Sequence, residues 1–344
     1  VNLTIFILLI ILTFSLVLKD QDVSQIFSVA AKVKKQYILF AVLAMSIYIL
    51  GEAVNITRIL KELGEKSKLI SNIRYTLIGF FFSAITPAAS GGQPMEIYYM
   101  HKDDISVANS TLALLMQLCS LQIVTITVGT ISAVIHFEVL KSGLIYLLIL
   151  GIILNSSALM LLIIAIFSKR LSEGLIKFAV KLLKFFRIPN VEKKQEKLEK
   201  ELESYQTSAK YIKEHKILML KTVITTVVQM IAYYSVPYWI YLAFGLTEYN
   251  IFEILTLQAV LYATVSGIPS PGAVGVSEGG FLGIFKNVFP ETIISSAMLL
   301  TRGANFYLFI IISAIIVMIS TFREKKIEKK QMQETEVLTE KSEK

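Results

Sequence analysis

The sequence predicts an all-α polytopic membrane protein, and three observations support that fold class. Hydrophobic residues make up 54% of the 344 residues, charged residues only 17%, and the apolar residues form long uninterrupted stretches. An average soluble domain carries about 25% charged residues. These features exclude a soluble enzyme, a disordered chain and a secreted disulfide scaffold. The single cysteine, Cys119, allows neither an intramolecular disulfide nor a cysteine-based metal site.

Several stretches are long enough to span a membrane. A bilayer core about 30 Å thick needs roughly 20 apolar residues per helix. The first stretch lacks the basic start and small-residue cleavage site of a signal peptide, so we interpret it as a membrane helix. We expect six full spans, at residues 1–18, 37–56, 107–135, 144–167, 217–244 and 292–320.

Two further apolar regions, 73–100 and 251–285, are interrupted in the middle. Proline and glycine divide each region into halves that are too short to cross the membrane. Irregular backbone at membrane depth is tolerated only where it is buried in protein or lines a wet cavity. Both regions are therefore predicted to be re-entrant hairpins made of broken helices. The prolines assigned to the breaks are Pro87, Pro94, Pro269 and Pro271.

The distribution of Lys and Arg predicts the orientation, because cytoplasmic loops of membrane proteins carry an excess of both. Segment 168–216 has thirteen basic residues, segment 323–344 seven and loop 57–74 five, whereas loop 136–143 has one. We place the first three on the cytoplasmic side, together with both termini. Loop 19–36, with four lysines, then falls outside and is the exception. Topology accounts for the net charge of +8, so the charge gives no indication of nucleic-acid binding.

The predicted domain organisation is a membrane domain over residues 1–322 followed by a charged cytoplasmic tail, 323–344. The membrane domain contains a basic cytoplasmic insert, 168–216. Two interpretations of the second half of that insert remain open: a solvated helix that packs one face on the membrane domain, or a docking helix for a partner subunit. Both rest on an apolar stripe at helical spacing, formed by Leu198, Leu202, Tyr205, Ala209 and Ile212.

The two broken regions share a pattern that indicates an internal repeat. Pro87 and Pro269 are 182 residues apart, and so are Glu96 and Glu278. Each half would contain three full spans, an odd number, so the second half must be inverted in the membrane. We predict two inverted repeats, 1–135 and 144–322, of the kind that transporters build around discontinuous helices. Alternatively, the breaks only allow tight packing along small residues such as Gly275, Gly279 and Gly283.

A few charged residues are predicted to lie at membrane depth, where each costs about 2.5–3.5 kcal/mol on insertion scales. Glu278 and Arg302 belong to the same half and could pair, as could Glu96 and Arg58. Broken helices also present free amide groups and positive dipole ends that attract anions. Together these groups predict a polar cavity for a headgroup phosphate, with Arg302 as its best partner. The alternative is that the ion pairs only lock the hairpins in place.

The complete predicted lipid-binding set adds the small residues of the breaks and one polar neighbour of the arginine. It comprises Arg302, Glu278, Glu96, Arg58, Ser90, Gly91, Gly92, Gly272 and Asn305. No metal site or cofactor is expected. His101, His136 and His215 lie in separate loops, and the sequence contains no metalloprotease, nucleophile-elbow or nucleotide-loop motif.

Three segments resemble the lysylphosphatidylglycerol synthase transmembrane family, also called the flippase-like domain family. They are TPAASGGQPMEIYYM (86–100), SGIPSPGAVGVSEGGF (266–281) and TRGANFY (301–307), and the similarity extends over about residues 1–322. The resemblance implies a module that moves aminoacylated phosphatidylglycerol from the inner to the outer leaflet of a bacterial or archaeal cell membrane. It also implies resistance to cationic antimicrobial peptides, because the outer leaflet becomes less negative.

The family's best-known members carry a further cytoplasmic domain that makes the lipid from aminoacyl-tRNA, and this chain ends at Lys344 without room for it. We therefore expect a stand-alone module that works by alternating access, with phospholipid and anionic membrane lipids as partners. A separate lipid synthase and a homo-oligomer are further possible partners. Two alternatives stay open: phosphatidylglycerol lysyltransferase activity or a subunit of such an enzyme, and transport of an isoprenoid or glycolipid carrier.

Overall fold

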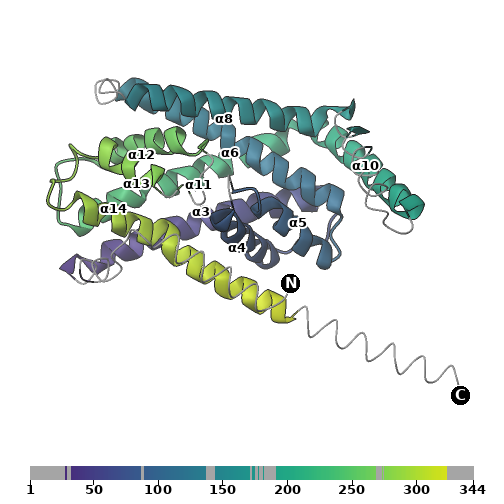
Figure 1. The fold of residues 1–344 in the computed structure, drawn as a ribbon, viewed down its shortest axis with the longest axis horizontal. Helices are drawn as coiled ribbons and strands as arrows, with labels where there is room; N and C mark the ends of the chain where they lie inside the picture. Colours follow the sequence, from purple (N-terminus) through teal and green to yellow (C-terminus); the bar gives the residue numbers. More distant parts are fainter. Residues whose placement is uncertain are drawn as a thin grey trace, which may run out of the picture.

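The computed structural model describes residues 28, 32–86, 89–136, 144–170, 173, 174, 177, 181, 191–268, 273 and 275–323. The described part is helical, with short connections (Figure 1). In chain order the helices are α3 (Lys35–Glu62), α4 (Leu69–Ile85), α5 (Gly92–Lys102), α6 (Val107–Ile135), α8 (Leu144–Phe167), α10 (Val191–Glu214), α11 (Lys216–Ala243), α12 (Ile251–Val265), α13 (Val276–Ile284) and α14 (Ile294–Arg302). A π-helical segment, η3 (Gly303–Tyr307), follows α14, and the helix then continues to Arg323.

The predicted all-α membrane fold is confirmed. Within the described residues, five helices are long and apolar enough to cross a membrane: α3, α6, α8, α11 and the helix Ile294–Arg323. Their bounds agree with five of the six expected spans, and α6 coincides with the predicted 107–135. The expected span 1–18 and the tail after residue 323 lie outside the described residues.

Both interrupted regions consist of two short helices, as predicted. Helices α4 and α12, with 17 and 15 residues, are apolar but shorter than the spans, and each is followed by a break. In each break an alanine, Ala89 or Ala273, has positive φ. One expected break residue is wrong: Pro94 lies in the first turn of α5, where its missing N–H removes no helical hydrogen bond. Residues Pro87, Pro269, Pro271 and Gly272 lie outside the described part.

The helix lengths recur between the halves. The series α3, α4, α5, α6 has 28, 17, 11 and 29 residues, and α11, α12, α13 and the last helix have 28, 15, 9 and 30. Ala89 and Ala273 each lie three residues before the next helix starts. These recurrences favour an internal repeat, while the inverted relation of the halves stays a prediction.

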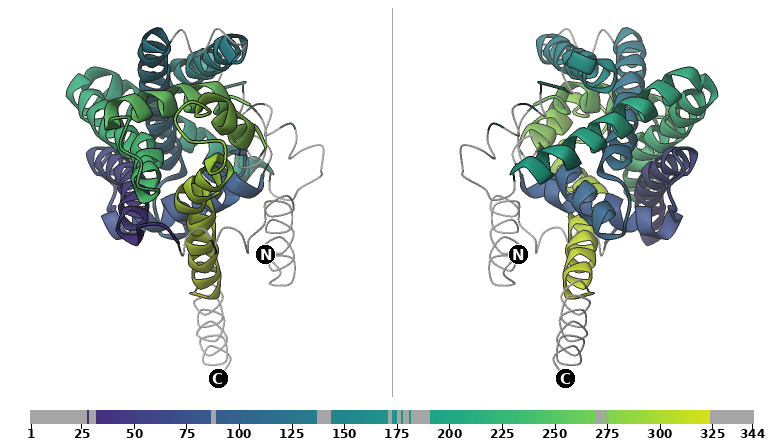
Figure 2. Two further views of the ribbon diagram at one scale, coloured as in Figure 1. Left: turned by 90° about the vertical axis from the view of Figure 1, so that its left-hand side faces the viewer. Right: turned by 90° about the vertical axis from the view of Figure 1, so that its right-hand side faces the viewer.

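The connections gather at two ends of the long helices, as the sequence predicts for two sides of a membrane. At one end the Lys34 amide donates to the Ala243 carbonyl (3.0 Å). At this same end, beside the start of α12, the His136 ring bonds the Thr256 hydroxyl (2.7 Å). Helix α10 lies at the opposite end from α13 (Figure 1). The last helix and α8 lie on opposite sides of the domain (Figure 2).

The apolar stripe of α10 packs against the membrane domain, which confirms the first of the two interpretations. Tyr205, Ala209 and Ile212 are buried. The Tyr205 hydroxyl donates to the Ala165 carbonyl (2.9 Å), and the Glu201 carboxylate accepts from the backbone N–H of Ala108 (3.0 Å) at the start of α6. This stripe is therefore occupied within the chain.

Helices α3 and α11, which have equal lengths, pack against each other more extensively than any other pair of described helices. Gly51 lets them approach closely, since a Cβ there would lie 2.9 Å from the Gln229 Cβ. Next to this contact the Asn55 amide donates to Gln117 (2.9 Å) and Thr226 (3.0 Å), and the Gln117 amide donates to Gln229 (3.3 Å). Buried amides that bond one another fix the register of α3, α6 and α11.

We predict that Gly51→Ala lowers stability, because the added methyl forces α3 and α11 apart. Overpacking of this kind costs about 1–3 kcal/mol. The measurement is the thermal unfolding midpoint of the detergent-purified protein. Gly279→Ala is the matched control, since nothing lies within 4 Å of a Cβ added there. Equal midpoints for the two variants would contradict close packing at Gly51.

The predicted orientation is testable with single cysteines. Cys119 is buried, so labelling at new exposed sites has a low background. We expect Glu248→Cys to react with a membrane-impermeant maleimide on intact cells, and Glu196→Cys on α10 to react only after permeabilisation. The opposite pattern would show that the orientation is reversed.

Candidate functional site

The two charged residues expected to pair in the second half form a buried ion pair. The Arg302 Nε lies 2.9 Å from the Glu278 Oε1, and both side chains are 9% exposed. Glu278 is in the first turn of α13, and Arg302 ends α14. The pair thus joins the short helix of the second hairpin to the last long helix.

The second carboxylate oxygen of Glu278 stabilises the start of α13. It accepts a hydrogen bond from the Gly275 backbone N–H at 2.6 Å. Gly275 has φ +83°, a conformation that glycine adopts without the steric cost of a Cβ. An acidic side chain here also interacts favourably with the positive end of the helix dipole. One carboxylate therefore both caps α13 and binds Arg302.

Arg302 is held from its other side by aromatic rings. Its guanidinium carbon lies 4.0 Å from the Phe306 ring centroid and 5.8 Å from that of Tyr307. Both rings belong to η3, the π-helical turn that follows Arg302. π-helical turns within α-helices occur frequently at functional sites. Arg302 was predicted from the sequence, whereas this local distortion of the helix was not.

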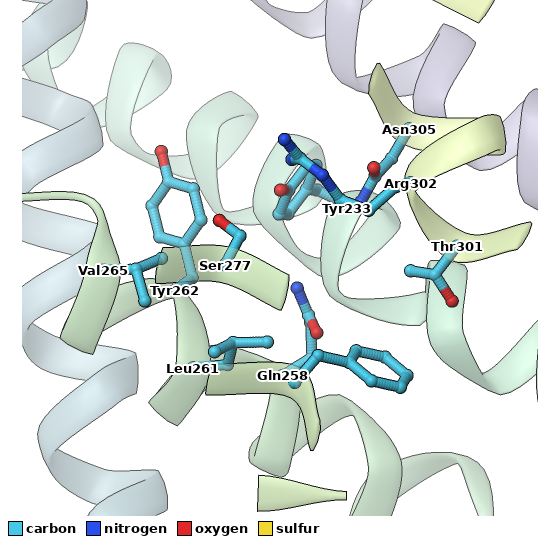
Figure 3. A pocket seen from close by; sticks show the side chains of 10 residues that line it. Tyr233, Gln258, Leu261, Tyr262, Val265, Ser277, Thr301, Arg302 and Asn305 are labelled. Carbon is cyan, nitrogen blue, oxygen red and sulfur yellow. The ribbon is translucent and has the colours of Figure 1, made fainter. Parts of the chain in front are cut away.

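A small cavity lined by both apolar and polar side chains lies beside Arg302 (Figure 3). Its volume of about 20 Å³ accommodates one water-sized group. A phospholipid headgroup is larger than this cavity. The cavity is lined by Tyr233, Gln258, Leu261, Tyr262, Val265, Ser277, Phe281, Thr301, Arg302 and Asn305.

Of these lining residues, Arg302 and Asn305 were predicted from the sequence. Gln258 and the tyrosines were not, because single polar residues in an apolar helix do not reveal which face they occupy. The tyrosines extend the site towards α3: the Tyr233 ring lies 5.2 Å from that of Tyr48 and 5.3 Å from that of Tyr262. An aromatic layer therefore connects α3, α11 and α12 at the cavity.

Glu96, the expected counterpart of Glu278, has a different environment. It is 3% exposed, and its carboxylate packs directly against Gly79 of α4, where any side chain would collide with it. Its Oε2 has no hydrogen-bond partner within the described residues. Glu52 of α3 is close enough to interact electrostatically with it. The first half therefore contains two neighbouring carboxylates.

The two glutamates are also not equivalent in the fold. Helices α5 and α13 start 184 residues apart, at Gly92 and Val276, whereas the glutamates are 182 apart. When the two helices are aligned at their first residues, Glu96 corresponds to Gly280. Gly280 packs on Leu261 of α12, and Glu96 packs on Gly79 of α4. The sequence spacing thus aligned two residues with different structural roles.

The possible pair of Arg58 with Glu96 is not formed. The Arg58 Nη1 donates instead to the Asn55 side chain (2.9 Å), the Lys221 carbonyl (3.0 Å) and the Thr225 hydroxyl (3.0 Å). These partners lie on α3 and α11, so Arg58 links the two central helices. This contact is consistent with a structural role.

The small residues of the first break also have structural contacts. The Gly91 amide donates to the Thr86 hydroxyl at 2.9 Å, so that amide is already bonded. Gly92 packs so closely on Ser83 that a Cβ would collide with its hydroxyl. Ser90 is exposed beside them. These residues close the turn between α4 and α5, apart from the cavity at Arg302.

The histidines lie apart, as the sequence indicates. His136 bonds Thr256, His215 stacks on Tyr211 with centroids 3.8 Å apart, and His101 is in the last turn of α5. Within the described ranges, no three His, Cys, Asp or Glu side chains lie close enough together to bind a metal ion.

A family model described as the lysylphosphatidylglycerol synthase TM region matches residues 1–313. The chain belongs to this family. It is also 24% identical over 276 residues to a UPF0104 membrane protein of Archaeoglobus fulgidus, with 76% of this chain and 80% of the relative covered. The family match includes both broken hairpins, the ion pair and η3. The chain is thus a multi-pass membrane protein of the lysylphosphatidylglycerol synthase TM family, as the sequence resemblance suggested.

We predict that breaking the ion pair in this family member destabilises it. Glu278→Gln removes the carboxylate that binds Arg302, and removing one partner of a buried ion pair typically costs about 3–5 kcal/mol. Adding Arg302→Met should restore part of the lost stability, because it removes the buried charge that the carboxylate offset. Thermal unfolding of the two single variants and the double variant measures this coupling. A double variant whose loss equals the sum of the single losses would show that the two residues act independently.

Proposed function

We propose that this protein moves a phospholipid between the leaflets of the cell membrane, with aminoacylated phosphatidylglycerol as its substrate. The observation that carries the proposal is the buried Glu278–Arg302 pair beside a small cavity, at the junction of a broken helix and a π-helical turn. Intramembrane charges that face the interior of a helical domain mark substrate pathways.

The chemistry of the pair suits a headgroup that carries both signs of charge. A guanidinium binds phosphate oxygens through charge-assisted hydrogen bonds in a fixed geometry. The Glu278 carboxylate offers a counter-charge to an ammonium group. An aminoacylated phosphatidylglycerol contains both a phosphate and an ammonium, so it can replace the internal ion pair without leaving either residue unpaired.

Transport requires the closed cavity to open. The hairpin α12–α13 meets the last helix at the ion pair, and its break, which includes the left-handed Ala273, interrupts the helix at that level. We propose that substrate binding loosens the pair and lets the hairpin move relative to α14. Movement of the two hairpins in alternation would expose the site to one leaflet and then to the other.

The family description supports the choice of lipid, since it names lysylphosphatidylglycerol. Lysine attached to phosphatidylglycerol changes the headgroup from anionic to cationic. Its delivery to the outer leaflet would reduce the negative surface potential that attracts cationic peptides. We propose that a separate synthase makes the lipid and that this protein thereby contributes to resistance against such peptides.

The test is a translocation assay in proteoliposomes with fluorescent lysylphosphatidylglycerol, in which a membrane-impermeant quencher reports the outer leaflet. We expect wild-type protein to move lipid faster than protein-free vesicles do. Arg302→Ala should reduce the rate at least tenfold, because the phosphate loses its binding partner. Arg74→Ala is the control: Arg74 pairs with the partly exposed Asp103, away from the cavity.

Two outcomes would contradict the proposal. Wild-type protein that moves no lipid would refute translocation, and an Arg302→Ala variant as fast as wild type would refute the site. Incubation with labelled aminoacyl-tRNA and phosphatidylglycerol tests the synthase alternative, and formation of labelled lipid would favour an enzyme.

A further inference from the structure

The buried glutamate of the first hairpin, Glu96, has no counter-charge within the described residues. It is 3% exposed. One carboxylate oxygen, Oε1, packs against Gly79 of α4, and the other, Oε2, has no hydrogen-bond partner in the described part of the chain. None of the ion pairs that the described residues form includes Glu96. Glu96 therefore differs from Glu278, whose carboxylate binds an amide and a guanidinium.

A carboxylate that is buried without a cation is unstable as an anion. Burying an isolated charge costs far more than burying a neutral polar group, and in proteins such a group usually takes up a proton instead. Ionisable residues inside membrane domains are rare, and they mark ion pathways and proton relays. The environment of Glu96 therefore suits a carboxyl group that binds and releases a proton.

A second carboxylate, that of Glu52 on α3, lies close enough to interact electrostatically with Glu96. Two negative charges at short distance repel each other strongly in a low-dielectric interior, and one bound proton removes this repulsion. The proton needs no cavity, since it forms an O–H bond on a carboxylate oxygen. A metal ion would need more ligands, and within the described ranges no three His, Cys, Asp or Glu side chains lie close enough together to hold one.

Other titratable and charged side chains on the helices around Glu96 interact elsewhere. On α4, Arg74 and Tyr75 both bind Asp103, which lies about two helical turns beyond Glu96 at the end of α5. The remaining groups have other surroundings: Tyr99 bonds Thr321, Lys102 lies over the Tyr98 ring, His101 is exposed, and Cys119 of α6 lies near Tyr205. Among the described residues, Glu52 is thus the ionisable group with which Glu96 interacts.

The tyrosines of the aromatic layer connect these carboxylates with the ion pair of the second half. Tyr48 precedes Glu52 by four residues, so both lie on one face of α3. The Tyr48 ring lies 5.2 Å from that of Tyr233, which lines the cavity together with Arg302 (Figure 3). Tyr233 is close enough to both members of the ion pair to interact electrostatically with them. A movement that widens the cavity for a headgroup must shift these tyrosines, so it also changes the surroundings of Glu52.

We propose that Glu96 and Glu52 form a proton-binding site, and that the protein carries a proton across the membrane as it moves a lipid. The proton comes from water on one side, forms an O–H bond with one carboxylate oxygen and returns to water on the other side. This inference rests on the proposed lipid translocation and adds its coupling ion. Transporters with discontinuous helices bind substrate and coupling ions near each other in the same way.

The first experiment measures translocation of lysylphosphatidylglycerol in proteoliposomes at equal pH on both sides. A rate that follows one protonation changes by up to about tenfold per pH unit, so we expect at least about a tenfold change for wild type over three units around neutrality. Glu96→Gln, which cannot exchange a proton, should have a flat profile. The matched control is Glu291→Gln, because Glu291 is an exposed carboxylate between α13 and α14.

The control should retain the wild-type profile. Titration of the lysyl amine affects every variant equally, so a profile that is the same in Glu96→Gln and wild type would overturn the inference. If the two carboxylates act as one site, adding Glu52→Gln to Glu96→Gln should cause no further change in the profile.

The second experiment follows the proton itself with a pH-sensitive dye trapped inside the vesicles. Addition of lysylphosphatidylglycerol to the outer leaflet should change the internal pH with wild-type protein but not with Glu96→Gln. Replacing sodium by potassium should change neither result, and a requirement for sodium would overturn the assignment to a proton. Lipid movement without a change in internal pH would also overturn it, while leaving translocation intact.

Infrared spectroscopy of the purified protein in detergent separates failure of the inference from failure of the proposed function, because it needs no transport. A protonated carboxyl group absorbs at a different frequency from an ionised carboxylate. Wild type and Glu291→Gln should show a protonated carboxyl band at neutral pH that the double variant of Glu52→Gln and Glu96→Gln lacks. This band without lipid movement would refute translocation and support the proton site, whereas its absence from wild type would refute the site.

Discussion

A helix that begins inside a membrane domain leaves its first amide groups without partners, and Glu278 meets that constraint here. Its carboxylate accepts from the Gly275 amide at the start of α13 and binds Arg302 at the end of α14. Each contact makes the other possible: the arginine offsets the buried negative charge, and the capped helix holds the carboxylate in place. The position of the second hairpin against the last helix depends on this carboxylate.

The central helices provide the enclosure that such a broken helix needs. The close approach of α3 and α11 at Gly51, and the amide network around Asn55 and Gln117, hold the two halves together. Tyrosines from α11 and α12 then line the cavity beside Arg302, and Tyr48 of α3 packs against them. Non-helical backbone at membrane depth is tolerated only in such a protein-lined interior. The architecture therefore keeps the rigid contacts at the centre and the interrupted helices beside them.

The two halves use similar helices for different chemistry. Glu278 pairs with Arg302 and caps a helix, whereas Glu96 packs against Gly79 and lies near the second carboxylate, Glu52. In the second half a buried ion pair, a π-helical turn and a small cavity lie together. The two hairpins therefore differ in their buried charges, although the sequence motifs of both hairpins look alike.

The sequence by itself determined the membrane fold, five of the six expected spans and the two broken regions, and it indicated that Glu278 could pair with Arg302. Those features follow from local properties: the length of an apolar run, the effect of proline and glycine on a helix, and the cost of a charge in lipid. The partners of Arg58, the different environment of Glu96 and the convergence of Gln258, Thr301 and Asn305 were decided only by the tertiary structure. The sequence of an apolar helix does not reveal which of its faces is packed against another helix. Only the packing of helices that are distant in sequence determines which polar residues come together.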